Sequence, residues 1–164
     1  GSIDTKNSAG KILSNIISNK RDLIDLFRFS VVLGENSSHL LKIKHLVEKE
    51  EFINIYIQPY SMGELFMNFD IAIGAPGVSH IERMYCGLPS ILMPQNQIQE
   101  PLALAWKEHG GALLNTKSSD KVVNFLKFLS KNKTELKIIR DRGLKLIDGN
   151  GARRISKIIM KNIK

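Results

Sequence analysis

Short apolar runs alternate along the chain with longer stretches in which apolar residues recur every three or four positions. The short runs are typical of buried strands in a parallel sheet, and the longer stretches are typical of amphipathic helices. The predicted strands are 29–33, 53–57, 71–73, 90–93 and 112–114. The predicted helices are 8–19, one capped by Ser37 or Ser38, 61–68, one opening at Ser79, 97–109, one capped at 118–120, and two more divided by 148–151. Ser61 and Glu64 form a capping-box pattern at the start of the helix 61–68.

This alternation predicts an α/β fold, a Rossmann-like parallel sheet with helices on both faces. The 164 residues contain no repeat or linker, so residues 1–164 are expected to form a single domain. In such sheets ligands bind beyond the carboxyl ends of the strands. Candidate ligand-binding residues are therefore sought in the loops that follow the strands.

The segment Asp70–Pro94 carries the strongest functional signal. A buried strand leads into a Gly-Ala-Pro-Gly turn and then into a helix, which is the arrangement in which backbone N–H groups and the helix dipole receive a phosphate. Pro76 removes one donor, and Gly77, Val78 and Ser79 supply the other three. Glu82, one turn further along, is within reach of a sugar hydroxyl. We therefore predict a nucleotide or nucleotide-sugar site here.

Each of these residues also has a structural explanation. Gly74 and Gly77 suit any tight turn. Ser79 and Glu82 fit a capping box, in which Glu82 bonds back to the Ser79 amide. His80 is expected to face solvent, or alternatively to contact the ligand. The local sequence leaves these alternatives open.

Few other residues suggest a binding or catalytic role. Asn96 and Gln97 follow the strand 90–93, where their amides can bind a sugar or a nucleobase, or cap the next helix. The dinucleotide motif G-x-G-x-x-G is absent, which argues against NAD. Neither the histidines nor Cys86 has the spacing of a metal site. We expect no metal and no other cofactor.

The overall charge narrows the class of partner. The chain has 24 Lys and Arg against 16 Asp and Glu, a net charge of +8, which suits an anionic ligand or surface. The basic residues also interleave with apolar ones at helical spacing, and we favour the interpretation that they form solvated helix faces. No aromatic residues interleave with the basic ones, so nucleic acid is not predicted. No apolar stretch is long enough for a membrane span, the first residues do not resemble a signal peptide, and the single cysteine excludes an internal disulfide. A cytoplasmic location is expected.

Several segments, taken in order, resemble one known family. They are Asp4-Thr5-Lys6-Asn7, Asp70-Ile71-Ala72-Ile73-Gly74-Ala75, the helix start from Gly77 to Arg83, Gly87-Leu88-Pro89-Ser90, Asn96-Gln97 and 148–153. The chain resembles the C-terminal nucleotide-binding domain of GT-B-type glycosyltransferase-like proteins. Within these it is most similar to the UDP-sugar hydrolase of pseudaminic acid biosynthesis and the related spore coat polysaccharide biosynthesis proteins.

The resemblance implies a UDP-sugar site. Glu82 would hold the uridine ribose, and the N–H groups of Gly77, Val78 and Ser79 would hold the diphosphate. The backbone near Ile57 would read the uracil edge, while Asn96 and Gln97 would meet the sugar or phosphate. The family turn is usually Gly-Ala-Gly-Gly followed by Ser or Thr, and here Pro76 and Val78 depart from that pattern.

The resemblance also implies that this domain is the C-terminal half of a two-domain enzyme. The family's catalytic histidine lies in an N-terminal domain that this sequence does not include, so no catalytic residue is assigned and the domain alone is expected to be inactive. The whole protein would hydrolyse a UDP-sugar and release UDP. The alternatives are the donor-binding domain of a UDP-sugar glycosyltransferase and a degenerate, non-catalytic binding or assembly domain.

The first strand of the family's sheet is missing from this sequence. That strand is central in the expected order 3-2-1-4-5-6. We expect either that the sheet closes, with strand 29–33 pairing strand 71–73, or that a second copy donates a strand in a homodimer.

Overall fold

The computed structural model describes residue 4 and residues 6–163, in which helices and strands alternate as predicted. The elements are α1 (Ser8–Ser18), α2 (Lys20–Leu23), β1 (Phe29–Leu33), α3 (Leu40–Val47), β2 (Ile53–Ile57), α4 (Met62–Met67), β3 (Ala72–Gly74), α5 (Val78–Tyr85), β4 (Ser90–Leu92), α6 (Gln99–Glu108), β5 (Leu114–Asn115), α7 (Ser119–Lys131), α8 (Thr134–Leu146) and α9 (Gly151–Asn162). Both β1 and β2 have the predicted bounds, and α2 was not predicted.

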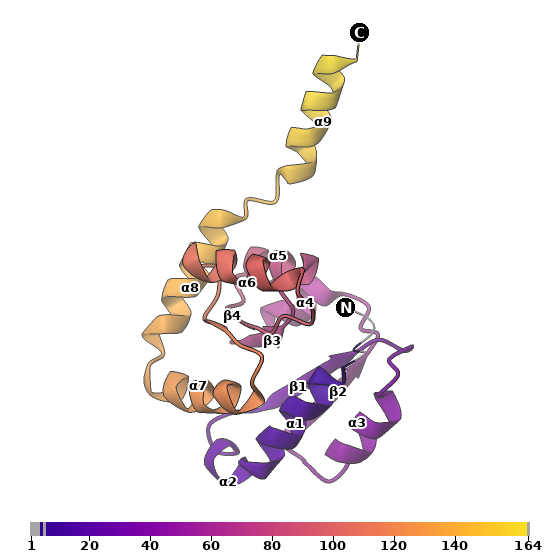
Figure 1. Ribbon diagram of the computed structural model, residues 1–164, viewed down its shortest axis with the longest axis vertical. Coiled ribbons are helices and arrows are strands. Elements are labelled where there is room, and N and C mark those ends of the chain that lie inside the picture. The colour runs from indigo at the N-terminus through magenta and orange to yellow at the C-terminus, as the bar shows by residue number, and fades with distance from the viewer. Residues whose placement is uncertain (1–3, 5, 164) are drawn as a thin grey trace.

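The described strands form two separate parallel sheets (Figure 1). One sheet pairs β1 with β2, in a register that runs from Phe29 opposite Ile53 to Leu33 opposite Ile57. The other has the order β3-β4-β5. The expectation that strand 29–33 pairs strand 71–73 is therefore wrong. The α/β class with parallel strands is confirmed, in the form of two small sheets.

Helices cover only one face of the β1–β2 sheet. Side chains of α1 and α3 pack with this sheet in one core: Leu13, Ile16, Val31, Leu33, Ile43, Val47 and Ile53. On β2, Asn54 and Tyr56 alternate with the core residues Ile53 and Ile55, and both are exposed. The prediction of helices on both faces is wrong for this sheet, because the outward positions of β2 stay in contact with solvent.

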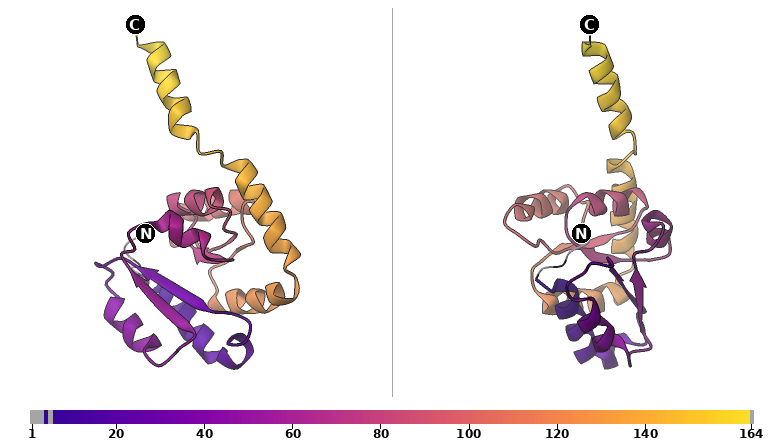
Figure 2. Two further views of the ribbon diagram at one scale, coloured as in Figure 1. Left: turned by 180° about the vertical axis from the view of Figure 1, so that it is seen from behind. Right: turned by 90° about the vertical axis from the view of Figure 1, so that its right-hand side faces the viewer.

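Both faces of the β3–β5 sheet are covered. Ile91 packs in a core with α7 and α8, whereas Leu92, the next residue on β4, packs with Ala103 of α6. Successive residues of a strand point to opposite faces, so β4 contributes to a core on each side. Figure 2 shows helices on both sides of this sheet, as predicted.

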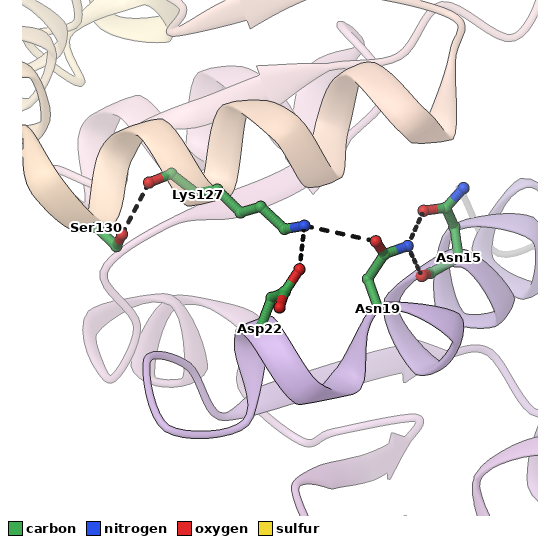
Figure 3. Close-up of polar contacts among 5 residues, drawn as sticks. All are labelled: Asn15, Asn19, Asp22, Lys127 and Ser130. Atoms are coloured by element: carbon green, nitrogen blue, oxygen red, sulfur yellow. Dashed lines mark hydrogen bonds and ion pairs between the residues drawn. The ribbon is translucent and has the colours of Figure 1, made fainter.

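Helix α7 connects the two halves of the molecule, one built around the β1–β2 sheet and the other around the β3–β5 sheet. Val123 belongs to the core of the β1–β2 sheet, while Val122, Leu126 and Leu129 belong to the core of the β3–β5 sheet. Lys127 adds a polar link, because its ammonium lies 2.6 Å from the carboxylate of Asp22 in α2 (Figure 3). Side-chain packing through α7 thus joins two sheets that share no strand pairing.

Helix α9 extends away from the rest of the molecule in every view (Figures 1 and 2). It has no buried residue, and Arg154 near its start pairs with Asp148 at 2.5 Å. Within residue 4 and residues 6–163, no helix is long and apolar enough to cross a membrane.

Candidate functional site

The turn between β3 and α5 leads straight from a strand into a helix. Helix α5 begins at Val78, and Gly77 occupies the N-cap position with φ −90° and ψ −159°. Ser79 is therefore the second helical residue rather than the cap, and α5 has no side-chain cap. The capping-box interpretation of Ser79 and Glu82 is wrong, because the helix starts earlier than that pattern requires.

The first N–H groups of α5 have no partner within the described part of the chain. Gly77, Val78 and Ser79 donate no hydrogen bond to any described residue, and the first bond of the helix runs from the His80 N–H to the Gly77 carbonyl at 2.9 Å. Val78 is 73% exposed, and Gly77 and Ser79 are partly exposed. The three donors assigned to a phosphate therefore have no partner among the described residues.

Three other helix starts show how protein atoms satisfy such donors. The Asp4 carboxylate accepts the N–H groups of Ser8 and Ala9 in α1, at 2.8 and 2.7 Å. Ser61 caps α4 and Ser118 caps α7, both as predicted, each through a 3.3 Å bond from a backbone N–H to the serine hydroxyl. A cap of this kind stabilises a helix by about 1 kcal/mol, and α5 has none.

The two glycines of the turn are not explained by backbone conformation. Neither Gly74 nor Gly77 has a positive φ, so the turn itself does not demand glycine. A Cβ on Gly74 would lie 2.9 Å from the Arg83 guanidinium, whereas a Cβ on Gly77 would meet nothing within 4 Å. Gly74 thus makes room for an arginine beneath the turn, and Gly77 borders open space above it.

Arg83 lies buried under this turn, with 6% of its surface exposed. Its Nε donates to the Ser90 hydroxyl at 2.9 Å, and its Nη2 donates to the Ala75 carbonyl at 3.0 Å. Burial lowers the pKa of Arg83 to about 10, which leaves it charged at neutral pH. No carboxylate within residue 4 and residues 6–163 forms an ion pair with it.

Sequence reasoning assigned no role to Arg83. The available signal is its place on α5, three residues after His80, on the face that the structure buries. A basic residue on the buried face of a short helix needs polar partners, which here come from β4 and the turn.

Glu82 is exposed on α5. It forms no side-chain hydrogen bond or ion pair with the described residues, and so makes no capping bond to Ser79. Its carboxylate is free to accept hydrogen bonds from a ligand.

His80 is fully buried, which contradicts the expectation that it faces solvent. Its ring meets the Trp106 ring edge to face, with the centroids 5.4 Å apart. Burial, followed by the nearby charge of Arg83, lowers the pKa of His80 to about 4. The imidazole is therefore neutral at physiological pH and belongs to the packing between α5 and α6.

The remaining predicted site residues lie on other elements. Asn96 uses its side-chain oxygen to accept the Gln99 N–H at 3.0 Å, which matches the helix-capping alternative. Gln97 is exposed in the same loop. Ile57 ends β2, in the other sheet, and is 37% exposed. The described residues contain no group of three His, Cys, Asp or Glu side chains that could hold a metal ion.

The chain is similar to part of an archaeal protein. The chain is 30% identical over 102 residues to Uncharacterized protein MJ1062 of Methanocaldococcus jannaschii. The match covers 60% of this chain and 20% of that protein, so the chain spans about a fifth of the length of the relative it matches. No family model matches the chain.

Proposed function

We propose that the β3–α5 turn binds the diphosphate of a UDP-sugar. The observation that carries this proposal is that the N–H groups of Gly77, Val78 and Ser79 have no hydrogen-bond partner among the described residues. Unpaired N–H groups and the positive end of the helix dipole together favour an anion at this position. The open space beside Gly77 leaves room for the ligand to approach the backbone.

The other contacts follow the family resemblance. The free carboxylate of Glu82 would accept hydrogen bonds from the uridine ribose, and the backbone at Ile57 would read the uracil. Asn96 caps α6 with its oxygen, which leaves its NH₂ group to meet the sugar or phosphate together with Gln97.

At the level of the whole protein, we propose the C-terminal half of a cytoplasmic GT-B-type UDP-sugar hydrolase. Water would attack the sugar on the face supplied by an N-terminal domain, while this domain holds the departing UDP. The free N–H groups would stabilise the negative charge that develops on the leaving diphosphate. Transfer of the sugar to an acceptor, as in a glycosyltransferase, would use this half in the same way.

A non-catalytic binding or assembly role is the second candidate. Pro76 favours it, because proline contributes no N–H to the turn. The open edges of β1 and β3 also fit the earlier proposal that a second copy donates a strand in a homodimer.

Calorimetric titration with UDP, using ADP and NAD as controls, tests the proposed function. We expect UDP to bind more tightly than ADP, and Glu82→Gln to weaken UDP binding about tenfold because a charged hydrogen bond is lost. The matched control is Glu64→Gln, an exposed glutamate in the first turn of α4. If the unaltered chain does not bind UDP, the proposed UDP-sugar site is wrong, and the non-catalytic role becomes the better candidate.

A further inference from the structure

The Arg83 guanidinium is buried beneath the turn that leads into α5 and forms no ion pair with a described carboxylate, and the nearby charge of the exposed Glu82 offsets only part of the cost of its burial. Its two hydrogen bonds go to neutral acceptors, the Ser90 hydroxyl and the Ala75 carbonyl. Burying a charge without an ion-pair partner costs free energy, so an anion bound near the guanidinium would reduce that cost.

The same guanidinium shapes the turn. Its bond to the Ala75 carbonyl holds the residue that immediately precedes Pro76, and its bond to Ser90 ties it to the first residue of β4. Gly74 admits the side chain, because a Cβ there would come within 2.9 Å of Nη1. Arg83 thus joins the end of β3, the turn, α5 and β4 through one side chain.

We propose that Arg83 is a positioning residue that makes this turn selective for a diphosphate. This inference rests on the proposed function and adds to it the charge of the preferred ligand. By holding the Ala75 carbonyl from inside the protein, Arg83 keeps that acceptor turned away from the ligand side. The N–H groups of Gly77, Val78 and Ser79 then face an incoming anion, whose charge compensates the buried guanidinium.

The effect on different ligands separates this positioning role from a role in packing alone. A residue that only stabilised the fold would affect all ligands of the domain equally. A positively charged positioning residue affects the binding of charged ligands and leaves the binding of the uncharged nucleoside unaffected. The ratio of UDP affinity to uridine affinity therefore measures the role directly.

The experiment compares the unaltered chain with Arg83→Met, Arg83→Lys and Ser90→Ala, using UDP, uridine and inorganic pyrophosphate as probes. Arg83→Met removes the charge and both bonds, and we expect UDP and pyrophosphate affinities to fall at least tenfold while uridine affinity changes less than twofold. Arg83→Lys keeps the charge and should recover part of the loss. Ser90→Ala keeps the charge but removes one anchor, and should weaken UDP binding about threefold.

Thermal melts establish which variants fold. If Arg83→Met does not fold, the positioning role is tested with Arg83→Lys and Ser90→Ala. Both variants keep a positive charge beneath the turn and change only the hydrogen bonds that hold it. Equal losses for UDP and uridine, or no loss for any variant, would overturn the positioning role while leaving UDP binding intact. Failure of the unaltered chain to bind UDP would overturn the proposed function instead. Arg83-dependent binding of pyrophosphate in that case would still support an anion site.

Discussion

The starts of α1 and α4, beside the β1–β2 sheet, differ from the start of α5, after β3, in how their first N–H groups are satisfied. In the β1–β2 half, Asp4 satisfies the first amides of α1, and Ser61 caps α4 where the chain leaves β2. In the β3–β5 half, α5 follows β3 with three amides unpaired and a buried arginine beneath them. A junction between a strand and a helix is therefore a candidate binding site when the first N–H groups of the helix have no protein partner.

The halves also differ in how they are covered. Helices lie on one face of the β1–β2 sheet and on both faces of the β3–β5 sheet. Since the sheets share no strand pairing, α7 carries the packing between them. We therefore expect the two halves to unfold together, and the starts of α4 and α5 to respond differently to loss of their serines.

The largest expected effect is on the connection through α7. Leu126 is 2% exposed, and Leu126→Ala should lower the free energy of unfolding by about 3 kcal/mol, through lost burial and a residual cavity. The control Phe128→Ala, at a side chain 46% exposed, should cost much less. Urea unfolding followed by Trp106 fluorescence and by circular dichroism should give one shared transition. Two separate transitions would show that the halves unfold independently.

The next effect concerns pH and the β3–β5 half. The folded pKa of His80, lowered to about 4, lies below its unfolded value of 6.5, so the unfolded chain binds the extra proton first. The stability that His80 contributes is present above pH 6.5 and is lost as the pH falls toward 4. Between pH 7 and pH 5 this loss should be about 2 kcal/mol.

His80→Phe should remove most of that pH dependence, measured as the free energy of unfolding in urea at both pH values. The control is His45→Gln, because the His45 side chain is 81% exposed. This variant should keep the pH dependence of the free energy of unfolding. An unchanged pH dependence in His80→Phe would mean that His80 is not the buried neutral group described here.

The smallest effect compares two serines at helix starts. Ser61 caps α4, and Ser61→Ala should cost about 1 kcal/mol of stability because the Glu64 N–H loses its acceptor. Ser79 lies inside the first turn of α5 without a capping bond, so Ser79→Ala should change stability by less than about 0.5 kcal/mol. Chemical denaturation measures both, and equal costs would restore the capping-box interpretation of Ser79.

The sequence predicted the elements well because local patterns determine them. The apolar runs at 29–33 and 53–57 match β1 and β2, and the serine caps at Ser61 and Ser118 form as expected. The start of α5 was misplaced because Gly77, without a side chain to signal a cap, takes the N-cap position that Ser79 was expected to fill.

Long-range contacts account for the other differences. His80 is buried because Trp106, in α6, packs against it, and Arg83 finds its partner Ser90 on β4. The two sheets are separate: among the described strands, β1 pairs only with β2, and β3 pairs only with β4. None of these pairings is encoded in a local spacing of residues.

The most direct test of the central claim is a site-resolved amide titration of the labelled chain with UDP. We predict that the N–H signals of Gly77, Val78 and Ser79 shift most, with the signals of Ser8 and Ala9, already bonded to Asp4, unchanged. Uridine should leave the three α5 signals nearly unmoved, because it carries no phosphate. If saturating UDP shifts none of the three, the open start of α5 is not a diphosphate site.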